Sequence, residues 1–140
     1  MVLVSDNKYI LVTGGYPKSQ AVKTEVIDAT DPTQTCFPLA NFPTGEYWMP
    51  TGGVIDGKIV VCQGDGGQKC FELQDNEWSE FATLAVDRYV GSGTVINDAL
   101  FLYSGISNSN EPFSEYVYSD GTTKNGPNLY LTGGNKDFGM

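Results

Sequence analysis

A short stretch in the middle of the chain decides the fold: DGKIVVCQG at residues 56–64. Its Asp-Gly pair tolerates positive φ, as the turn of a β-hairpin requires, and a run of strand-forming residues follows it up to a glycine. A strand that is almost continuously apolar is typical of a position covered on both faces of its sheet. The stretch therefore predicts a hairpin whose second strand is buried.

The same pattern recurs along the chain at intervals of a few tens of residues. Apolar strands that end in glycine are found at 10–15 (ILVTGG), 59–64 (IVVCQG), 100–105 (LFLYSG) and 129–134 (LYLTGG). A strand comes before each of the first three copies, at 2–4, 51–55 and 93–96. Two strands follow each copy, at 24–28 and 37–39, at 70–73 and 78–81, and at 115–118 and 122–124. Each unit is therefore predicted to be a four-stranded antiparallel meander.

Three such units occupy residues 1–44, 45–87 and 88–129, and 130–140 is predicted to be the truncated start of a further unit or a tail. Four-stranded sheets of this kind bury their faces against one another, and when stacked radially they are the blades of a β-propeller. The sequence therefore predicts an all-β fold, a propeller fragment with three blades.

The composition narrows the classes of function. The chain has 140 residues, enough for one compact domain or part of a larger one. Its 8 Lys and Arg against 17 Asp and Glu give a net charge of -9, which repels nucleic acid and anionic membranes. It has no histidine, which excludes histidine-based triads and histidine-ligated metals. We therefore expect no catalytic residues, no metal and no cofactor, and an acidic surface suited to basic protein partners.

The middle unit carries a more specific pattern. It has the turn and strand at 56–64, an apolar third strand at 70–73 and a tryptophan, Trp78, in its fourth strand. This arrangement resembles the kelch repeat, in which an apolar second strand ends in glycines and a Trp lies in the fourth strand. The outer units depart from it, since they have Phe37 and Thr123 at the tryptophan position. The resemblance spans roughly 1–129 and implies a kelch-type propeller.

Kelch propellers usually close with about six blades, so the resemblance implies that three blades form half a ring. An open half-ring leaves an apolar sheet face at each end, and large exposed apolar patches are unusual on a monomer. Two interpretations stay open: a homodimer that completes the ring about a two-fold axis, or a piece of a chain whose other blades are missing. In either case we expect a non-enzymatic scaffold for protein–protein interaction.

Binding residues are expected in loops at one face of the disc, where the second-to-third-strand loops and the connections between blades emerge together. These loops are 16–22, 65–69, 106–113, 43–50 and 85–89. Their candidate binding residues are Tyr16, Tyr47, Trp48, Arg88, Tyr89, Asn108 and Phe113. Tyr and Trp dominate interface hot spots, although Tyr47 and Trp48 are equally consistent with packing against the neighbouring blade.

The alternative function is a sugar-binding or sugar-active propeller of the sialic-acid type. Some kelch-type propellers act on sugars with an arginine and a carboxylate, and Arg88 is the only arginine of this chain, with Asp87 or Glu46 as carboxylates. A sugar site requires Arg88 to point into the axial pocket of a closed ring. A scaffold tolerates Arg88 buried between blades.

The cysteines bear on the cellular compartment. Cys62 ends a second strand and Cys70 begins the third, so their hairpin brings the two close enough for a disulfide. A bridge implies an oxidising compartment, as in the secreted kelch proteins whose strands carry cysteines, and it slightly favours an extracellular location. Two buried thiols in a cytosolic blade are the other interpretation. Cys36 is then free or paired with a cysteine outside this chain.

Overall fold

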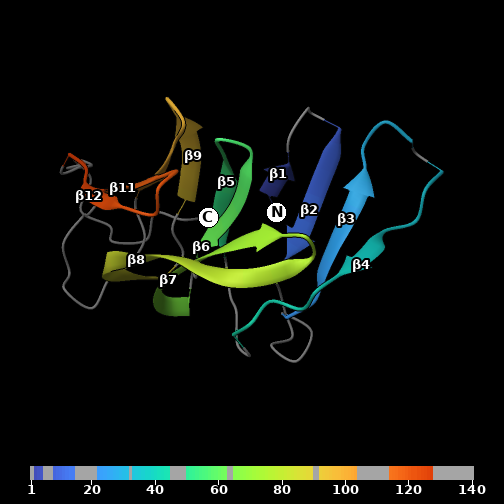
Figure 1. Cartoon of the computed structure of the whole chain (residues 1–140), viewed down its shortest axis with the longest axis horizontal. Coiled ribbons are helices and arrows are strands. Elements are labelled where there is room, and N and C mark those ends of the chain that lie inside the picture. The colour runs from blue at the N-terminus through green and yellow to red at the C-terminus, as the bar shows by residue number, and fades with distance from the viewer. Residues whose placement is uncertain are drawn as a thin grey trace, which may run out of the picture.

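The structure, a computed structural model, describes residues 2–4, 8–14, 22–31, 33–44, 50–62, 65–89, 92–103 and 114–127. Twelve β-strands make up its regular structure, and this part of the chain contains no helix (Figure 1). The strands form three sheets of four antiparallel strands each. Within each sheet, strands that follow one another in sequence are paired.

The first sheet contains β1 (Val2–Val4), β2 (Tyr9–Thr13), β3 (Thr24–Asp28) and β4 (Phe37–Leu39). The second contains β5 (Thr51–Ile55), β6 (Lys58–Cys62), β7 (Asp65–Gln74) and β8 (Glu77–Tyr89). The third contains β9 (Ser92–Ile96), β10 (Ala99–Tyr103), β11 (Glu115–Tyr118) and β12 (Thr123–Asn125). These sheets confirm the predicted all-β fold of three four-stranded units.

Two-residue turns with positive φ connect several strands. Asp56 and Gly57 have φ values of 50° and 75° between β5 and β6, and Asn97 and Asp98 have φ values of 50° and 56° between β9 and β10. Gly, Asn and Asp tolerate this left-handed region, whose twist matches that of the paired strands. The hairpin turn expected at Asp56-Gly57 is confirmed, and Asn97-Asp98 forms a second turn of the same kind.

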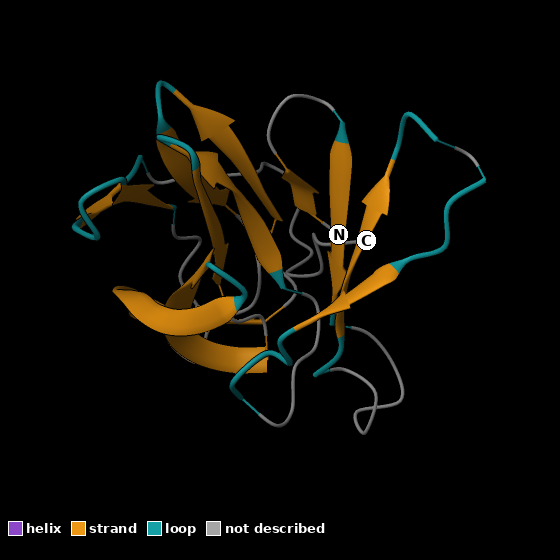
Figure 2. Ribbon diagram, turned by 45° about the vertical axis from the view of Figure 1, so that its right-hand side comes forward, coloured by secondary structure: helices purple, strands orange, loops and turns teal. Residues whose placement is uncertain are grey.

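The sheets are stacked in a row with the second sheet in the middle. Strand β5 contacts β1 on one side and β9 on the other, so the first strands of the three sheets are neighbours (Figure 1). The fourth strands β4 and β12 lie at opposite ends of the row (Figures 1 and 2). This arrangement is that of successive propeller blades, whose first strands lie next to one another.

An apolar core lies between the first and second sheets. Leu11 of β2 packs there with Val61 of β6 and with Phe71 and Leu73 of β7. Phe42, from the connection between the two sheets, completes this first core and is 2% exposed. The first and second sheets are therefore held together by side chains from both and from the segment that joins them.

A second core lies between the second and third sheets. Val60 and Cys62 of β6 contribute to it from one side, and Leu100 and Leu102 of β10 from the other. Val60 and its neighbour Val61 point into different cores, and both are fully buried. The prediction that this strand is covered on both faces is confirmed.

Strands β7 and β8 are longer than the sequence predicts. The loop expected at 65–69 lies in β7, and the connection expected at 85–89 lies in β8. The two strands pair with each other over this extension through irregularities between Asp65 and Gly67 and between Gly67 and Lys69. Glycines that indicate a loop here occupy bulges in a strand instead, because the partner strand supplies backbone hydrogen bonds to them.

The extension of β8 also changes the boundary between the second and third units. The sequence places this boundary between residues 87 and 88, with Arg88 just before the first strand of the third unit, whereas β8 continues to Tyr89. Strand β9 begins at Ser92. Arg88 therefore belongs to the last strand of the second sheet, because its backbone pairs with β7.

Candidate functional site

Most of the binding residues expected from the sequence lie outside the described residues. These are Tyr16, Tyr47, Trp48, Asn108 and Phe113, together with the tail at 130–140. Arg88 and Tyr89 lie at the end of β8, where they pair with Gly67 and Asp65. Their side chains lie outside the described part of the structure, so both interpretations of Arg88, in an axial pocket or buried between blades, stay predictions.

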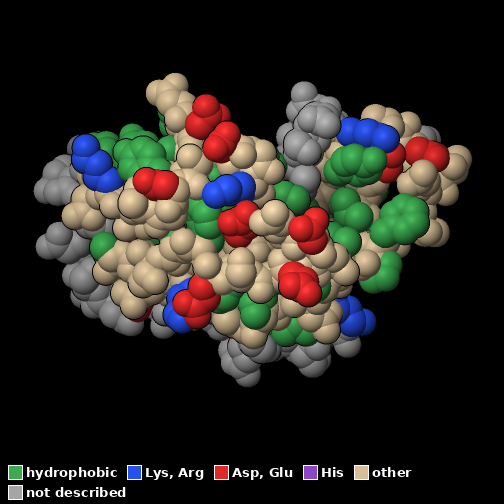
Figure 3. Space-filling view, viewed as in Figure 1, with side chains coloured by type: hydrophobic (Ala, Val, Ile, Leu, Met, Phe, Trp, Pro, Cys, Tyr) green, Lys and Arg blue, Asp and Glu red, His purple; other side chains and the backbone are tan. Residues whose placement is uncertain are grey.

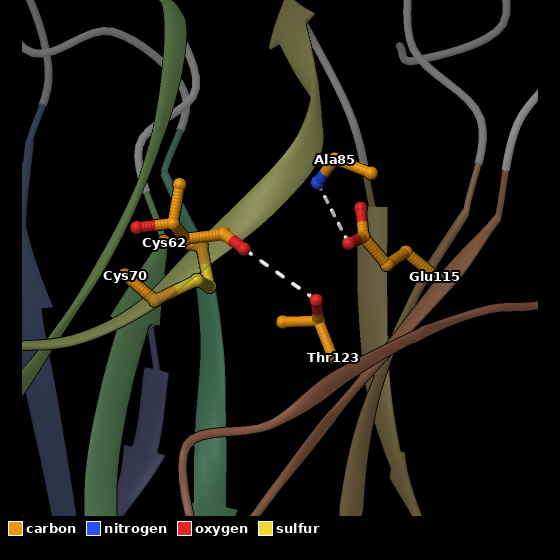
Figure 4. Close-up of a disulfide and its surroundings, with 6 residues drawn as sticks. Cys62, Cys70, Ala85, Glu115 and Thr123 are labelled. Carbon is orange, nitrogen blue, oxygen red and sulfur yellow. Dashed lines mark hydrogen bonds between the residues drawn. A yellow bond between two sulfur atoms is a disulfide. The ribbon is translucent and has the colours of Figure 1, made fainter.

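Cys62 and Cys70 are joined by a disulfide that connects directly opposite residues of β6 and β7. Both cysteines are fully buried in the second core, next to the third sheet (Figure 4). The bridge therefore ties the second and third strands of the middle sheet together where the third sheet packs on them. Cys36 is an exposed free cysteine in the segment between β3 and β4.

A glutamate connects the second and third sheets beside this disulfide. Glu115, the first residue of β11, is fully buried, and its Oε1 accepts a hydrogen bond from the backbone N–H of Ala85 in β8 at 2.9 Å (Figure 4). On the same side, the Thr123 hydroxyl donates to the Thr83 carbonyl at 3.5 Å. The third sheet is therefore joined to the edge strand β8 by polar contacts as well as by its apolar core.

The face of the third sheet that points away from the second carries four aromatic rings. Leu100 and Leu102 point into the second core, so the residues that alternate with them, Phe101 and Tyr103, point the other way. Phe101 is directly opposite Tyr116, and side chains of opposite residues share a face. Tyr118 lies on this face as well, two residues further along β11.

These rings form a continuous series, which we call the aromatic ladder. The ring centroids of Tyr103 and Phe101 are 5.7 Å apart, those of Phe101 and Tyr116 are 4.7 Å apart, and those of Tyr116 and Tyr118 are 6.2 Å apart. Tyr118 is 36% exposed. The sequence indicates this feature only through aromatic residues two positions apart in two strands, because the strand register decides that they meet.

At the opposite end of the row, the first sheet also has an outward face, on which three of four side chains are apolar. Leu11 points into the first core, so Ile10 and Val12 point away from the second sheet. Ile27 is directly opposite Ile10, and Glu25 is directly opposite Val12, so both lie on this face. All four side chains are half-buried. We call this set of four residues the outward face of the first sheet.

Charged side chains are spread over the surface of the molecule. On the side seen in Figure 3, acidic side chains lie over the middle and at the right-hand end, and hydrophobic side chains lie among them and toward both ends. Within the described residues no group of three or more Cys, Asp or Glu side chains is arranged to hold a metal ion. The same residues contain no helix long and apolar enough to cross a membrane.

Three aspartates have lowered pKa values because each accepts hydrogen bonds from a threonine two residues later. The Thr30 hydroxyl and backbone N–H donate to Asp28 Oδ1 at 2.6 and 2.9 Å, which lowers the pKa of Asp28. Equivalent contacts lower the pKa of Asp31 and of Asp120. The Lys8 ammonium lies 3.3 Å from Asp28 Oδ2. These carboxylates stabilise turns and remain ionised over the physiological pH range.

No protein-family model matches the chain, and no curated protein matches it in sequence. Among solved structures, the fold is similar to that in "Structure of YjhT", with a TM-score of 0.72 and 12% sequence identity, over 90% of this chain. The chain spans 44% of the length of that chain. The similarity shows the fold: antiparallel four-stranded sheets that match part of a kelch propeller.

Proposed function

We propose that the chain is a non-enzymatic scaffold for protein–protein interaction, which binds partners through the two outward sheet faces at its ends. The observation that carries this proposal is that both faces resemble the faces buried inside the molecule. The outward face of the third sheet carries the aromatic ladder, and the outward face of the first sheet carries Ile10, Val12 and Ile27. In the middle sheet, the apolar residues at the equivalent strand positions are buried against a neighbouring sheet.

The partner that best fits both faces is a second copy of the chain. In a row of three blades, the third sheet of one copy can pack on the first sheet of the other, and a two-fold axis generates the same contact again. Six blades then close a ring. At about 25 cal/mol per Å², covering a few hundred Å² of apolar surface at each contact is worth on the order of 10 kcal/mol before the costs of association.

The first experiment is the mass of the native protein by sedimentation velocity at about 10 μM. Self-association predicts the mass of two chains, since two separate apolar contacts stabilise the dimer. A mass equal to one chain at this concentration contradicts self-association, and the outward faces then belong to contacts with other proteins.

A pair of variants tests which faces meet. Ile27→Arg disrupts the outward face of the first sheet, and Tyr116→Arg disrupts the aromatic ladder; each is expected to give a monomer, because each breaks both contacts of the symmetric dimer. A mixture of the two variants retains one intact contact, between the intact ladder of one and the intact first sheet of the other. We expect the mixture to form a dimer, weaker than the wild type. A mixture that stays monomeric contradicts this pairing of the faces.

The sugar-binding alternative depends on Arg88. It requires a ring whose axial pocket receives the Arg88 side chain, so Arg88→Lys should abolish binding of an acidic sugar without changing the sedimentation coefficient. Binding of such sugars is measured by calorimetry. The scaffold proposal expects no heat of binding from either protein.

A further inference from the structure

Glu25 and Glu115 occupy the same position in two different sheets. In the first sheet Ile10 is opposite Ile27 and Val12 is opposite Glu25. In the third sheet Leu100 is opposite Val117 and Leu102 is opposite Glu115. In each case an aliphatic pair is followed, two residues along, by an aliphatic residue opposite a glutamate. Both glutamates lie on the face that a preceding blade covers in a propeller.

The position is a buried contact point in the two sheets that have a preceding sheet in the chain. In the third sheet, Glu115 is fully buried and accepts a hydrogen bond from Ala85 of the preceding sheet at 2.9 Å. In the second sheet the position, opposite Val61, is taken by Phe71, which is 4% exposed and packs against the Phe42 ring at a centroid distance of 5.0 Å. In the first sheet, Glu25 is half-buried and directed away from the other two sheets.

From this equivalence we infer that Glu25 is a specificity-determining residue of the contact between two copies, and that its carboxylate accepts a hydrogen bond from a backbone N–H of the third blade of the second copy. The inference rests on the proposed self-association. A carboxylate covered by an apolar surface is costly unless it receives hydrogen bonds. Glu25 therefore favours a partner face that presents a backbone donor at the place where β8 presents Ala85 to Glu115.

The outward face of the third sheet carries a charge that is complementary to Glu25. Lys124 of β12 is directly opposite Tyr116, so it lies on the same face as the aromatic ladder and is exposed. The face that carries the carboxylate of Glu25 would therefore meet a face that carries one ammonium and four aromatic rings. This complementarity supports a second copy of the chain as the occupant.

The test compares dimer dissociation constants for the wild type, Glu25→Ala, Glu25→Gln and Glu77→Ala, measured by sedimentation equilibrium. Glu77 is exposed at the start of β8, away from both outward faces, so Glu77→Ala controls for the loss of one negative charge. Because a dimer contains two such contacts, we expect Glu25→Ala to weaken dimerisation about 10- to 100-fold relative to Glu77→Ala. Glu25→Gln should weaken it less, since its amide oxygen still accepts a hydrogen bond.

Failure of this inference differs from failure of the proposed function. A wild-type dimer with a dissociation constant that changes less than about 2-fold in Glu25→Ala would overturn the role of Glu25 and leave self-association standing. A monomeric wild type overturns both the role of Glu25 and the self-association on which it rests. Glu25 is not part of either core, so circular dichroism of each variant at low concentration should match the wild type and show that the monomer is folded.

Discussion

The carboxylate of Asp28 shows how a single residue organises a turn. Its Oδ1 accepts two hydrogen bonds from Thr30, and Lys8 approaches its other oxygen at 3.3 Å. Both donors favour the ionised form, which is why the pKa of Asp28 lies below its ordinary value. The turn between β3 and β4 therefore depends on a charge that is lost only in acid.

Thr30→Val should raise the pKa of Asp28 toward its ordinary value, because it removes the hydroxyl donor that contributes most to the lowering. A carboxylate with a lowered pKa stabilises the folded state above its unfolded pKa, and this contribution disappears as the pH falls through the folded pKa. The variant should therefore be less stable than the wild type at pH 7, with the difference vanishing in strong acid. Carbon-detected NMR titration measures the pKa, and urea unfolding measures the stability.

Thr122→Val is the matched control, since Thr122 makes the same two contacts with Asp120 in the third sheet. Thr122→Val should raise the pKa of Asp120 and leave the pKa of Asp28 unchanged. A shift of both aspartates in either variant would contradict a local origin of the lowered pKa.

Among the elements, the connection between the first and second sheets is held by Asn76, in the turn between β7 and β8, and by Trp78 near the start of β8. The Trp78 indole donates to the Ala40 carbonyl at 2.9 Å, and the Ala40 N–H donates to Asn76 Oδ1 at 2.7 Å. The Trp78 ring also packs edge to face on the Phe42 ring, with 4.9 Å between the ring centroids. Trp78, which the sequence singles out as the kelch-type tryptophan, therefore connects two blades.

Trp78→Ala should lower the free energy of unfolding by about 2–4 kcal/mol, because it removes a large half-buried ring and leaves the Ala40 carbonyl without its donor. Trp78→Phe should cost about 1 kcal/mol, since it loses chiefly the hydrogen bond. Urea unfolding measures both. As a control, Tyr118→Ala removes an aromatic ring from an outward face and should change the stability of the monomer by less than about 1 kcal/mol. Equal losses in Trp78→Ala and Tyr118→Ala would show that Trp78 has no special role between the sheets.

At the scale of the whole molecule, the proposed dimerisation through the two outward faces links thermal stability to protein concentration. If folded chains complete a ring in pairs, the thermal midpoint Tm should rise with protein concentration, because the dimer is favoured by mass action. Tyr116→Arg, which disrupts the aromatic ladder, should have a Tm that does not depend on concentration. Differential scanning calorimetry from about 5 to 200 μM checks this. A wild-type Tm that stays constant over the range would contradict a dimer that dissociates on unfolding.

The sequence by itself determined the features that depend on local chemistry. Asp56-Gly57 and Asn97-Asp98 form turns because these residues tolerate positive φ, and their positions mark where paired strands begin and end. The apolar run at 59–62 predicts that β6 is covered on both faces, because each of its side chains needs an apolar neighbour. Repetition of this unit then predicts stacked four-stranded sheets.

Only the tertiary structure decided which residues meet across strands and sheets. Phe101 and Tyr116 join one ladder because of the register between β10 and β11, and β8 reaches Tyr89 because β7 pairs with it through bulges. Glu115 looks in sequence like any strand residue that alternates with apolar ones, and its burial against Ala85 follows from how the third sheet packs on the second. Contacts of this kind join residues far apart in the chain, so local propensity and periodicity carry no information about them.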